Sequence, residues 1–129
     1  MTVPTEPLLI VDDEPTVCEV VAALAETLGY ETLRAQTGAD ALEILSNQSV
    51  AAVLLDIAMP DMSGETVAAT MLERGIDPPL VIMTGMVTDD VQQFVEEYPA
   101  SRCILAKPFM RADLKTALDT VLASGKPGE

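Results

Sequence analysis

The chain has 129 residues, enough for one domain with a buried core, and its two cysteines leave little role for disulfides. Its 21 acidic and 7 basic residues give a formal charge of −14, which opposes binding to nucleic acid or to an anionic membrane surface. Histidine is absent, which excludes histidine-based acid–base catalysis, Ser-His and Cys-His nucleophile pairs and histidine-containing zinc sites.

Short apolar segments that are typical of strands recur along the chain. We predict strands over residues 8–11, 31–35, 50–55, 80–83 and 103–106. Three of these are nearly continuous apolar runs, as expected for strands that are buried on both faces.

Segments with helical spacing separate the predicted strands. The first has an apolar stripe formed by Val17, Val20, Val21, Leu24 and Leu28. Gly29 can end this helix. Thr37, Ser63 and Thr88 can cap three further helices, which run through Leu45, Arg74 and Tyr98. The fifth helix is marked by Leu114, Leu118, Val121 and Leu122.

Five strands that alternate with five helices imply right-handed crossovers and a parallel sheet covered on both faces. At this length we expect a flavodoxin-like, doubly wound (βα)5 fold with strand order 2-1-3-4-5. Polar tails are expected at residues 1–7, which would also suit a linker, and at 125–129. The absence of a long apolar run and of a signal peptide, together with Cys18 and Cys103 in apolar stretches, favours a reduced, cytoplasmic protein.

Polar side chains gather where the predicted strands end. Asp12 and Asp13 follow the first strand, Asp56 the third, Thr84 the fourth and Lys107 the fifth. Ligands bind at this edge of such sheets, although the acids after the first strand could simply cap a helix. Carboxylates brought together need a shared proton or a cation, and Mg²⁺ suits an all-oxygen cluster. A carboxylate, a magnesium ion, a hydroxyl and an ammonium around one point favour phosphoryl transfer.

Four motifs fall at these strand ends: LLIVDDE, the D-x-x-M-P-x-x-x-G pattern from Asp56 to Gly64, VIMTG, and AKPF at 106–109. Together and in this order they resemble the receiver domains of bacterial two-component response regulators, which are CheY-like. The resemblance extends over essentially residues 7 to 124, so we expect a receiver domain over residues 8–124.

The resemblance implies that Asp56 is a phosphoacceptor. It would take a phosphoryl group from a phosphohistidine of a histidine kinase or of a histidine phosphotransfer protein. Asp13, Asp56 and the backbone carbonyl of Ala58 would ligate Mg²⁺, with Asp12 close by or acting through water. The domain would catalyse only its own phosphorylation and slow dephosphorylation, and is therefore expected to be a signalling domain.

The resemblance also implies how the signal is read. Thr84 and Lys107 would each contact a phosphoryl oxygen, and Pro108 would hold the 107–108 peptide bond in the cis form. Where the family often carries a switch Tyr or Phe, this chain has Ile104, so the rotation of an aromatic ring is unavailable. The signal would travel through Thr84, through the fourth helix or through a rearranged partner surface. The face of the fourth helix, fifth strand and fifth helix would bind a downstream protein, and we expect a monomer or weak dimer.

Ala58 and Met86 occupy the positions that, in the family, flank the water that attacks the phosphoryl group. Neither side chain can form a hydrogen bond to that water, so the phosphorylated state is expected not to be unusually short-lived.

Other functions are less consistent with these residues. A haloacid-dehalogenase-type phosphatase would have a second Asp at position 58, and a flavodoxin-type carrier would meet repulsion between its phosphate and residues 12–14. The main alternative is a receiver-like interaction module that acts without phosphorylation, which Ile104 mildly favours. The sequence leaves open whether the domain is a single-domain regulator or part of a larger protein such as a hybrid histidine kinase.

Overall fold

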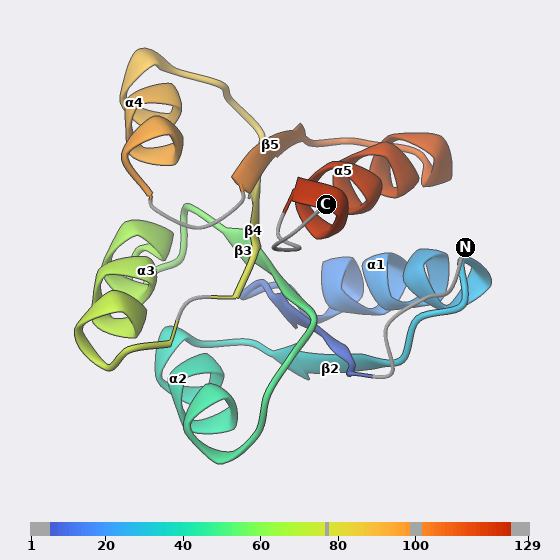
Figure 1. Cartoon of the computed structure of the whole chain (residues 1–129). Coiled ribbons are helices and arrows are strands. Elements are labelled where there is room, and N and C mark those ends of the chain that lie inside the picture. The colour runs from blue at the N-terminus through green and yellow to red at the C-terminus, as the bar shows by residue number, and fades with distance from the viewer. Residues whose placement is uncertain (1–5, 77, 99–101, 125–129) are drawn as a thin grey trace.

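Five strands and five helices alternate along the chain in the computed structural model, which describes residues 6–76, 78–98 and 102–124 (Figure 1). The strands are β1 (Leu8–Val11), β2 (Thr32–Ala35), β3 (Ala52–Asp56), β4 (Leu80–Thr84) and β5 (Arg102–Ala106). The helices are α1 (Pro15–Thr27), α2 (Gly38–Asn47), α3 (Gly64–Glu73), α4 (Asp89–Glu97) and α5 (Arg111–Ser124).

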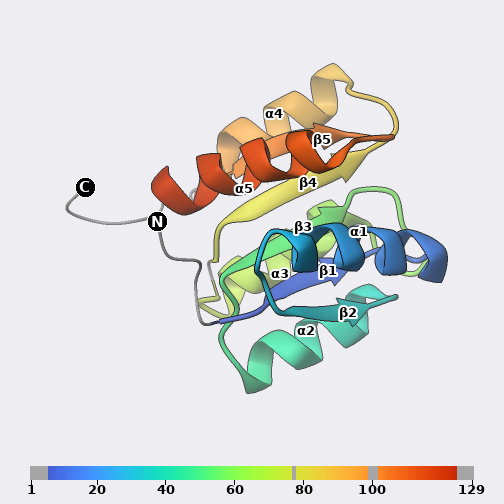
Figure 2. The ribbon, with the colours of Figure 1, turned by 90° about the vertical axis from the view of Figure 1, so that its right-hand side faces the viewer.

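The strands form one parallel sheet in the order β2-β1-β3-β4-β5, which confirms the predicted flavodoxin-like topology. Helices α1 and α5 cover one face, and α2, α3 and α4 cover the other (Figure 1). Strands β1, β3 and β4 are buried along their whole length, which explains why their sequences are apolar runs. Their arrowheads point to the same end of the molecule, which defines a carboxyl edge of the sheet (Figure 2).

Alternate residues of the central strands face the two helical layers. The core beneath α2, α3 and α4 includes Leu9, Val11, Val53, Leu55 and Ile82. The core beneath α1 and α5 includes Leu8, Ile10, Leu54, Val81 and Met83. Each central strand is therefore held on both sides, and the residues that follow it start from a rigid position.

The predicted helix caps are confirmed. The side chains of Thr37, Ser63 and Thr88 each accept a hydrogen bond from the backbone N–H three residues later. Gly29 and Gly75 follow the ends of α1 and α3 with φ of 98° and 73°, a conformation that favours glycine. Within the described part of the chain, no helix has the length and apolar character needed to cross a membrane.

Several details of the predicted elements differ. Strand β3 begins at Ala52, two residues later than predicted, β2 and β5 begin one residue away from their predicted starts, and α2 continues to Asn47. Strands β3 and β4 extend through Asp56 and Thr84, because the parallel ladder continues to the pairs with Met83 and Ala106. The prediction that Val20 lies on the buried stripe of α1 was wrong, since its side chain is 54% exposed. The buried face centres on Cys18, Val21, Ala22 and Ala25, and Val20 lies about 100° around the helix from Val21.

Candidate functional site

The polar residues predicted at the strand ends meet at the carboxyl edge of the sheet. Asp56 is the last residue of β3 and Thr84 the last residue of β4, while Asp12 directly follows β1. Lys107 directly follows β5, where its backbone N–H donates to the Thr84 carbonyl at 2.7 Å. The sheet therefore fixes the backbone positions of these residues before any side-chain interaction forms.

Three carboxylates form the centre of the site. Asp12, Asp13 and Asp56 each offer an oxygen atom, and these oxygens all lie within 4.8 Å of one another. Asp12 and Asp56 are buried, with exposed fractions of 0% and 5%. Buried carboxylates are costly unless a cation or hydrogen bonds compensate them. An all-oxygen donor set of this kind fits a hard divalent cation such as Mg²⁺.

Lys107 supplies the cationic side chain at this cluster. Its Nζ lies 2.7 Å from Asp12 Oδ2 and 3.6 Å from Asp56 Oδ2. Burial opposes the ammonium charge, but the hydrogen bond to Asp12 and the nearby carboxylates outweigh it and raise the pKa of Lys107. One protonated ammonium thus faces three carboxylates, and the remaining negative charge favours a divalent cation.

Burial also dominates the ionisation of Asp56. It raises the pKa of this carboxyl to about 6, against an ordinary value of 3.8, and the neighbouring Asp12 adds to the increase. The Ala58 N–H acts in the opposite direction by donating to Asp56 Oδ1 at 3.2 Å. A cation bound among the carboxylates would favour the ionised, nucleophilic form of Asp56.

The Thr84 hydroxyl is engaged within its own loop. Its Oγ1 donates to the Met86 carbonyl at 2.9 Å and accepts from the Met86 N–H at 3.1 Å. Donation from this hydroxyl to a ligand on Asp56 would therefore compete with its hydrogen bond to the Met86 carbonyl. The side chain of Met86 is 72% exposed.

The loop that follows Asp56 turns back closely on its own strand. The Gly64 N–H donates to the Ile57 carbonyl at 3.0 Å. A Cβ atom at Gly64 would lie 2.7 Å from the Asp56 carbonyl oxygen and 2.8 Å from Ile57 Cα, so glycine is required for this approach. Ala58 lies exposed at the start of this loop.

Pro108 directly follows Lys107, whereas Ile104 precedes it by three residues and lies within β5. The Lys107–Pro108 peptide bond is cis, the form that the resemblance implies. Ile104 lies in β5, away from the carboxylates, and packs against the core cluster beneath α2, α3 and α4, which includes Val91 and Val95 of α4. The structure thus brings Asp12, Asp13, Asp56 and Lys107 together but does not place Ile104 among them.

The direct ion pair between Lys107 and Asp12 was not predicted, since β5 and β1 are separated in the sheet by β3 and β4. A second missed contact joins Asp61 in the loop after Asp56 to the Gly38 N–H of α2 at 3.1 Å. Nothing local in the sequence signals either contact, because the partners are far apart along the chain.

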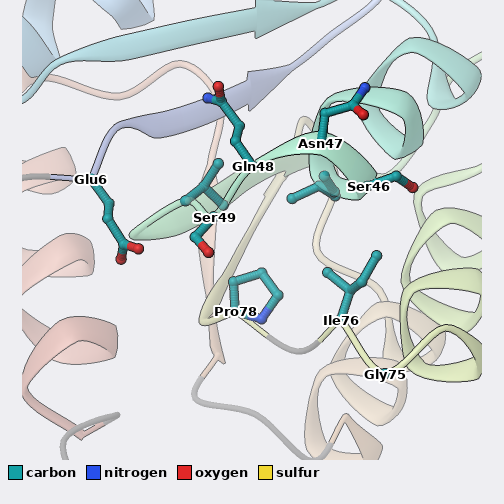
Figure 3. A pocket seen from close by; sticks show the side chains of 10 residues that line it. Glu6, Ser46, Asn47, Gln48, Ser49, Gly75, Ile76 and Pro78 are labelled. Carbon is teal, nitrogen blue, oxygen red and sulfur yellow. The ribbon is translucent and has the colours of Figure 1, made fainter.

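A separate cavity of about 520 Å³ lies away from the carboxylates (Figure 3). It is lined by residues that precede β1, β3 and β4, among them Glu6, Gln48, Ser49 and Pro78, and so lies toward the opposite edge of the sheet. Among the described residues that line it, Glu6 is the one carboxylate. The lining of this cavity therefore differs from the cluster of three carboxylates at the strand ends.

The structure therefore has an acidic cluster at the carboxyl edge of a flavodoxin-like parallel sheet. The chain belongs to the response regulator receiver domain family, whose sequence model matches residues 8–119. This confirms the family resemblance of the sequence and identifies the chain as a signalling domain of two-component systems.

Several characterised proteins are similar to the chain. The sensor histidine kinase RcsC of Salmonella typhi is 32% identical over 111 residues, which cover 86% of this chain and 12% of RcsC. The response regulator MprA of Mycobacterium sp. (strain KMS) is 31% identical over 123 residues, which cover 95% of this chain and 53% of MprA. The chain therefore spans about half or less of the length of these relatives.

Solved receiver structures have the same fold. The chemotaxis protein CheY4 of Vibrio cholerae superimposes with a TM-score of 0.83 at 25% identity, covering 92% of this chain and 100% of CheY4. The response regulator TrrA of Thermotoga maritima, in complex with Mg²⁺-BeF, gives a TM-score of 0.78 at 27% identity, covering 92% of this chain and 100% of TrrA.

The buried carboxyl of Asp56 predicts a specific dependence of stability on pH. Because its pKa is raised to about 6 in the folded state, folding binds its proton more tightly. The stability that this proton contributes is lost as the pH rises from about 4 through about 6. Asp56→Asn removes the ionisable group. We compare the free energy of unfolding of the variant with that of the wild type, both in EDTA. The value for the variant minus the value for the wild type is expected to be roughly 1–3 kcal/mol larger at about pH 8 than at about pH 4.

Urea denaturation of both proteins at the two pH values measures this difference. An equal gap at both pH values would show that the charge of Asp56 has no cost in the folded protein. Adding Mg²⁺ at about pH 8 is expected to stabilise the wild type more than the variant.

Proposed function

We propose that this domain is a phosphoacceptor in a two-component phosphorelay, with Asp56 as the residue that is phosphorylated. The observation that carries the proposal is the cluster of Asp12, Asp13 and Asp56 with Lys107 at the carboxyl edge of a receiver fold. The partner would be a histidine kinase or a histidine phosphotransfer protein, because the chain has no histidine of its own.

The transfer would be a nucleophilic substitution at phosphorus. A carboxylate oxygen of Asp56 would attack the phosphoryl group of a partner phosphohistidine, so that an O–P bond forms as the P–N bond breaks. The electron pair of the broken P–N bond would stay on the imidazole nitrogen of the partner histidine. Protonation of the imidazole would leave the histidine side chain neutral. The position of Asp56 at the end of a buried strand supports this role, since it holds the nucleophile in a fixed place.

The oxygen donors fit Mg²⁺. Asp13, Asp56 and the backbone carbonyl of Ala58 would hold it, with Asp12 close by or acting through water. When bound, Mg²⁺ would supply positive charge to the phosphoryl oxygens. The relative TrrA, whose structure contains Mg²⁺-BeF, supports this assignment.

Lys107 and Thr84 would stabilise the phosphoryl group once it is on Asp56. Lys107 Nζ lies 3.6 Å from Asp56 Oδ2, close enough to pair with a phosphoryl oxygen after a small movement. To donate to a phosphoryl oxygen, the Thr84 hydroxyl would give up its hydrogen bond to the Met86 carbonyl. Phosphorylation would therefore release one of the two hydrogen bonds that tie this hydroxyl to the loop between β4 and α4.

The released loop would pass the change to α4 and to the α4-β5-α5 face, which would bind a downstream protein. Ile104 packs against the core cluster to which α4 contributes, so the response would occur by a shift of this packing and not by rotation of an aromatic ring at position 104. The alternative, a receiver-like module that acts without phosphorylation, has no support from the pocket, whose acidic cluster is complete.

Residues 8–124 would form the receiver domain, with 1–7 and 125–129 as tails; positions 1–5 and 125–129 lie outside the described residues. The charge of −14 supports protein partners over nucleic acid. We also propose a cytoplasmic location and a monomer or weak dimer. The chain matches CheY4 over 100% of that protein but RcsC over only 12% of its length, so a single-domain regulator and a part of a larger protein such as a hybrid histidine kinase both stay open.

Incubation with acetyl phosphate and Mg²⁺, followed by intact-mass measurement, tests the proposal. The wild type is expected to gain the mass of one phosphoryl group, while Asp56→Asn gains none and EDTA prevents the gain. Lys107→Ala is expected to reduce the labelled fraction strongly, because its ammonium would no longer stabilise the phosphoryl charge. Labelling of Asp56→Asn to the same extent as the wild type would contradict the assignment of Asp56.

The side chain at position 58 should set the lifetime of the phosphorylated form. Ala58→Asn introduces a group that can orient the attacking water and is expected to shorten the half-life several-fold. Ala58→Val is the control, since it adds volume without a hydrogen-bonding group and should not shorten the half-life. Loss of label, followed by intact mass after removal of acetyl phosphate, gives both values. Equal half-lives in wild type and Ala58→Asn would exclude this role.

A further inference from the structure

The loop between β3 and α3 is tied to a helix outside the carboxylate pocket. Asp61, in this loop, accepts a hydrogen bond at Oδ2 from the backbone N–H of Gly38, with a donor–acceptor distance of 3.1 Å. Gly38 is the first residue of α2 and precedes Asp61 by 23 positions. The contact therefore joins two segments that are distant in the sequence.

The N-terminus of α2 is suited to this carboxylate. The first N–H groups of a helix have no acceptor within the helix, and negative charge is favourable there. The capping side chain of Thr37 accepts from the Asp40 N–H, not from the Gly38 N–H. Asp61 thus accepts a hydrogen bond from the Gly38 N–H, a donor with which the Thr37 side chain does not pair.

Gly38 allows the loop to approach this closely. A Cβ atom at Gly38 would lie 2.9 Å from Met62 Cβ and Sδ and 2.9 Å from Val67 Cγ2. Such distances are too short for a packed interior, so a side chain at this position would push the loop away from α2. The contact between the loop and α2 therefore depends both on glycine at position 38 and on the carboxylate of Asp61.

The two ends of the loop are joined by the hydrogen bond from the Gly64 N–H to the carbonyl of Ile57, the residue that follows β3, at 3.0 Å. Ala58 lies between this closure and the Asp61 contact, and it carries the carbonyl that would ligate Mg²⁺. We propose that Asp61 is a positioning residue for the cation site, which fixes the backbone of Ala58 by anchoring the loop to α2. This inference rests on the proposed function of the same site.

Removing the anchor is expected to weaken cation binding without removing a ligand. Partners that orient metal ligands directly typically change affinity about 10- to 100-fold when they are substituted. Asp61 acts through three residues of backbone and its side chain is exposed, so the expected loss for Asp61→Ala is smaller, about threefold to tenfold in the Kd for Mg²⁺.

Two variants separate anchoring from the loss of a negative charge. Asp61→Asn removes the charge but keeps an oxygen that can accept from the Gly38 N–H. Glu65→Gln removes the same charge from an exposed residue in the first turn of α3, close in sequence to Asp61. Calorimetric titration of the full chain with MgCl₂ gives the Kd of each variant, and thermal unfolding confirms that each is folded.

The expected result is that Asp61→Ala binds Mg²⁺ about threefold to tenfold more weakly than Glu65→Gln, while Asp61→Asn stays within about twofold of it. Hydrogen exchange of the Gly38 amide, measured by NMR without metal, is expected to accelerate in Asp61→Ala and to stay close to wild type in Glu65→Gln. This second readout reports the contact itself and does not depend on cation binding.

Equal Mg²⁺ affinity in Asp61→Ala and Glu65→Gln would overturn the positioning role, as would equal weakening in the Ala and Asn variants of Asp61. Unchanged Gly38 exchange in Asp61→Ala would show that the contact is not an anchor. Failure of the wild type to bind Mg²⁺ would instead contradict the proposed function, and is recognised because it affects every variant alike.

Discussion

Mutual repulsion among three carboxylates is the interaction on which the site depends. Asp12, Asp13 and Asp56 come from the ends of two neighbouring strands and place their oxygens within 4.8 Å of one another. Lys107 offsets part of this charge through its 2.7 Å contact with Asp12. One ammonium does not neutralise three carboxylates, so the cluster favours binding of a cation. Without that cation, the burial of Asp56 raises the pKa of its carboxyl to about 6. The excess negative charge of the three carboxylates would thus explain both the affinity for a metal ion and the ionisation of Asp56 when that ion binds.

The fold separates rigid parts of this site from parts that can move. Asp56 ends a strand that is buried along its whole length, whereas the Thr84 hydroxyl exchanges two hydrogen bonds with the Met86 backbone in the loop that follows β4. A negative phosphoryl group on Asp56 would compete for that hydroxyl, and the adjoining loop leads directly into α4. Position 104 in β5 carries an aliphatic side chain, while the aromatic side chains of this cluster, Phe94 and Tyr98, come from α4 and its C-cap. The proposed signal would therefore depend on the loop after β4 more than on one rotating side chain.

Much of the fold and site can be predicted from the sequence because the determining signals are local. Apolar runs mark the buried strands, capping residues mark the helix starts, and parallel strands must bring Asp56, Thr84 and Lys107 to one edge. Features that depend on the assembled fold could not be predicted. Val20 is exposed because of the angle at which α1 faces the sheet, and Lys107 reaches Asp12 across two intervening strands. The contact of Asp61 with Gly38 needs a loop and the start of α2, which come together only in the folded chain.

A crystal structure of the domain with Mg²⁺ and beryllofluoride tests the central claim most directly, because beryllofluoride has the tetrahedral shape of a phosphoryl group. The account predicts Mg²⁺ bound by Asp13, Asp56 and the Ala58 carbonyl, with beryllofluoride on a carboxylate oxygen of Asp56. Lys107 would contact one fluorine, and the Thr84 hydroxyl would have turned from Met86 to another. Beryllofluoride on a different carboxylate, or an adduct on Asp56 with the Thr84 hydroxyl still donating to the Met86 carbonyl, would contradict it.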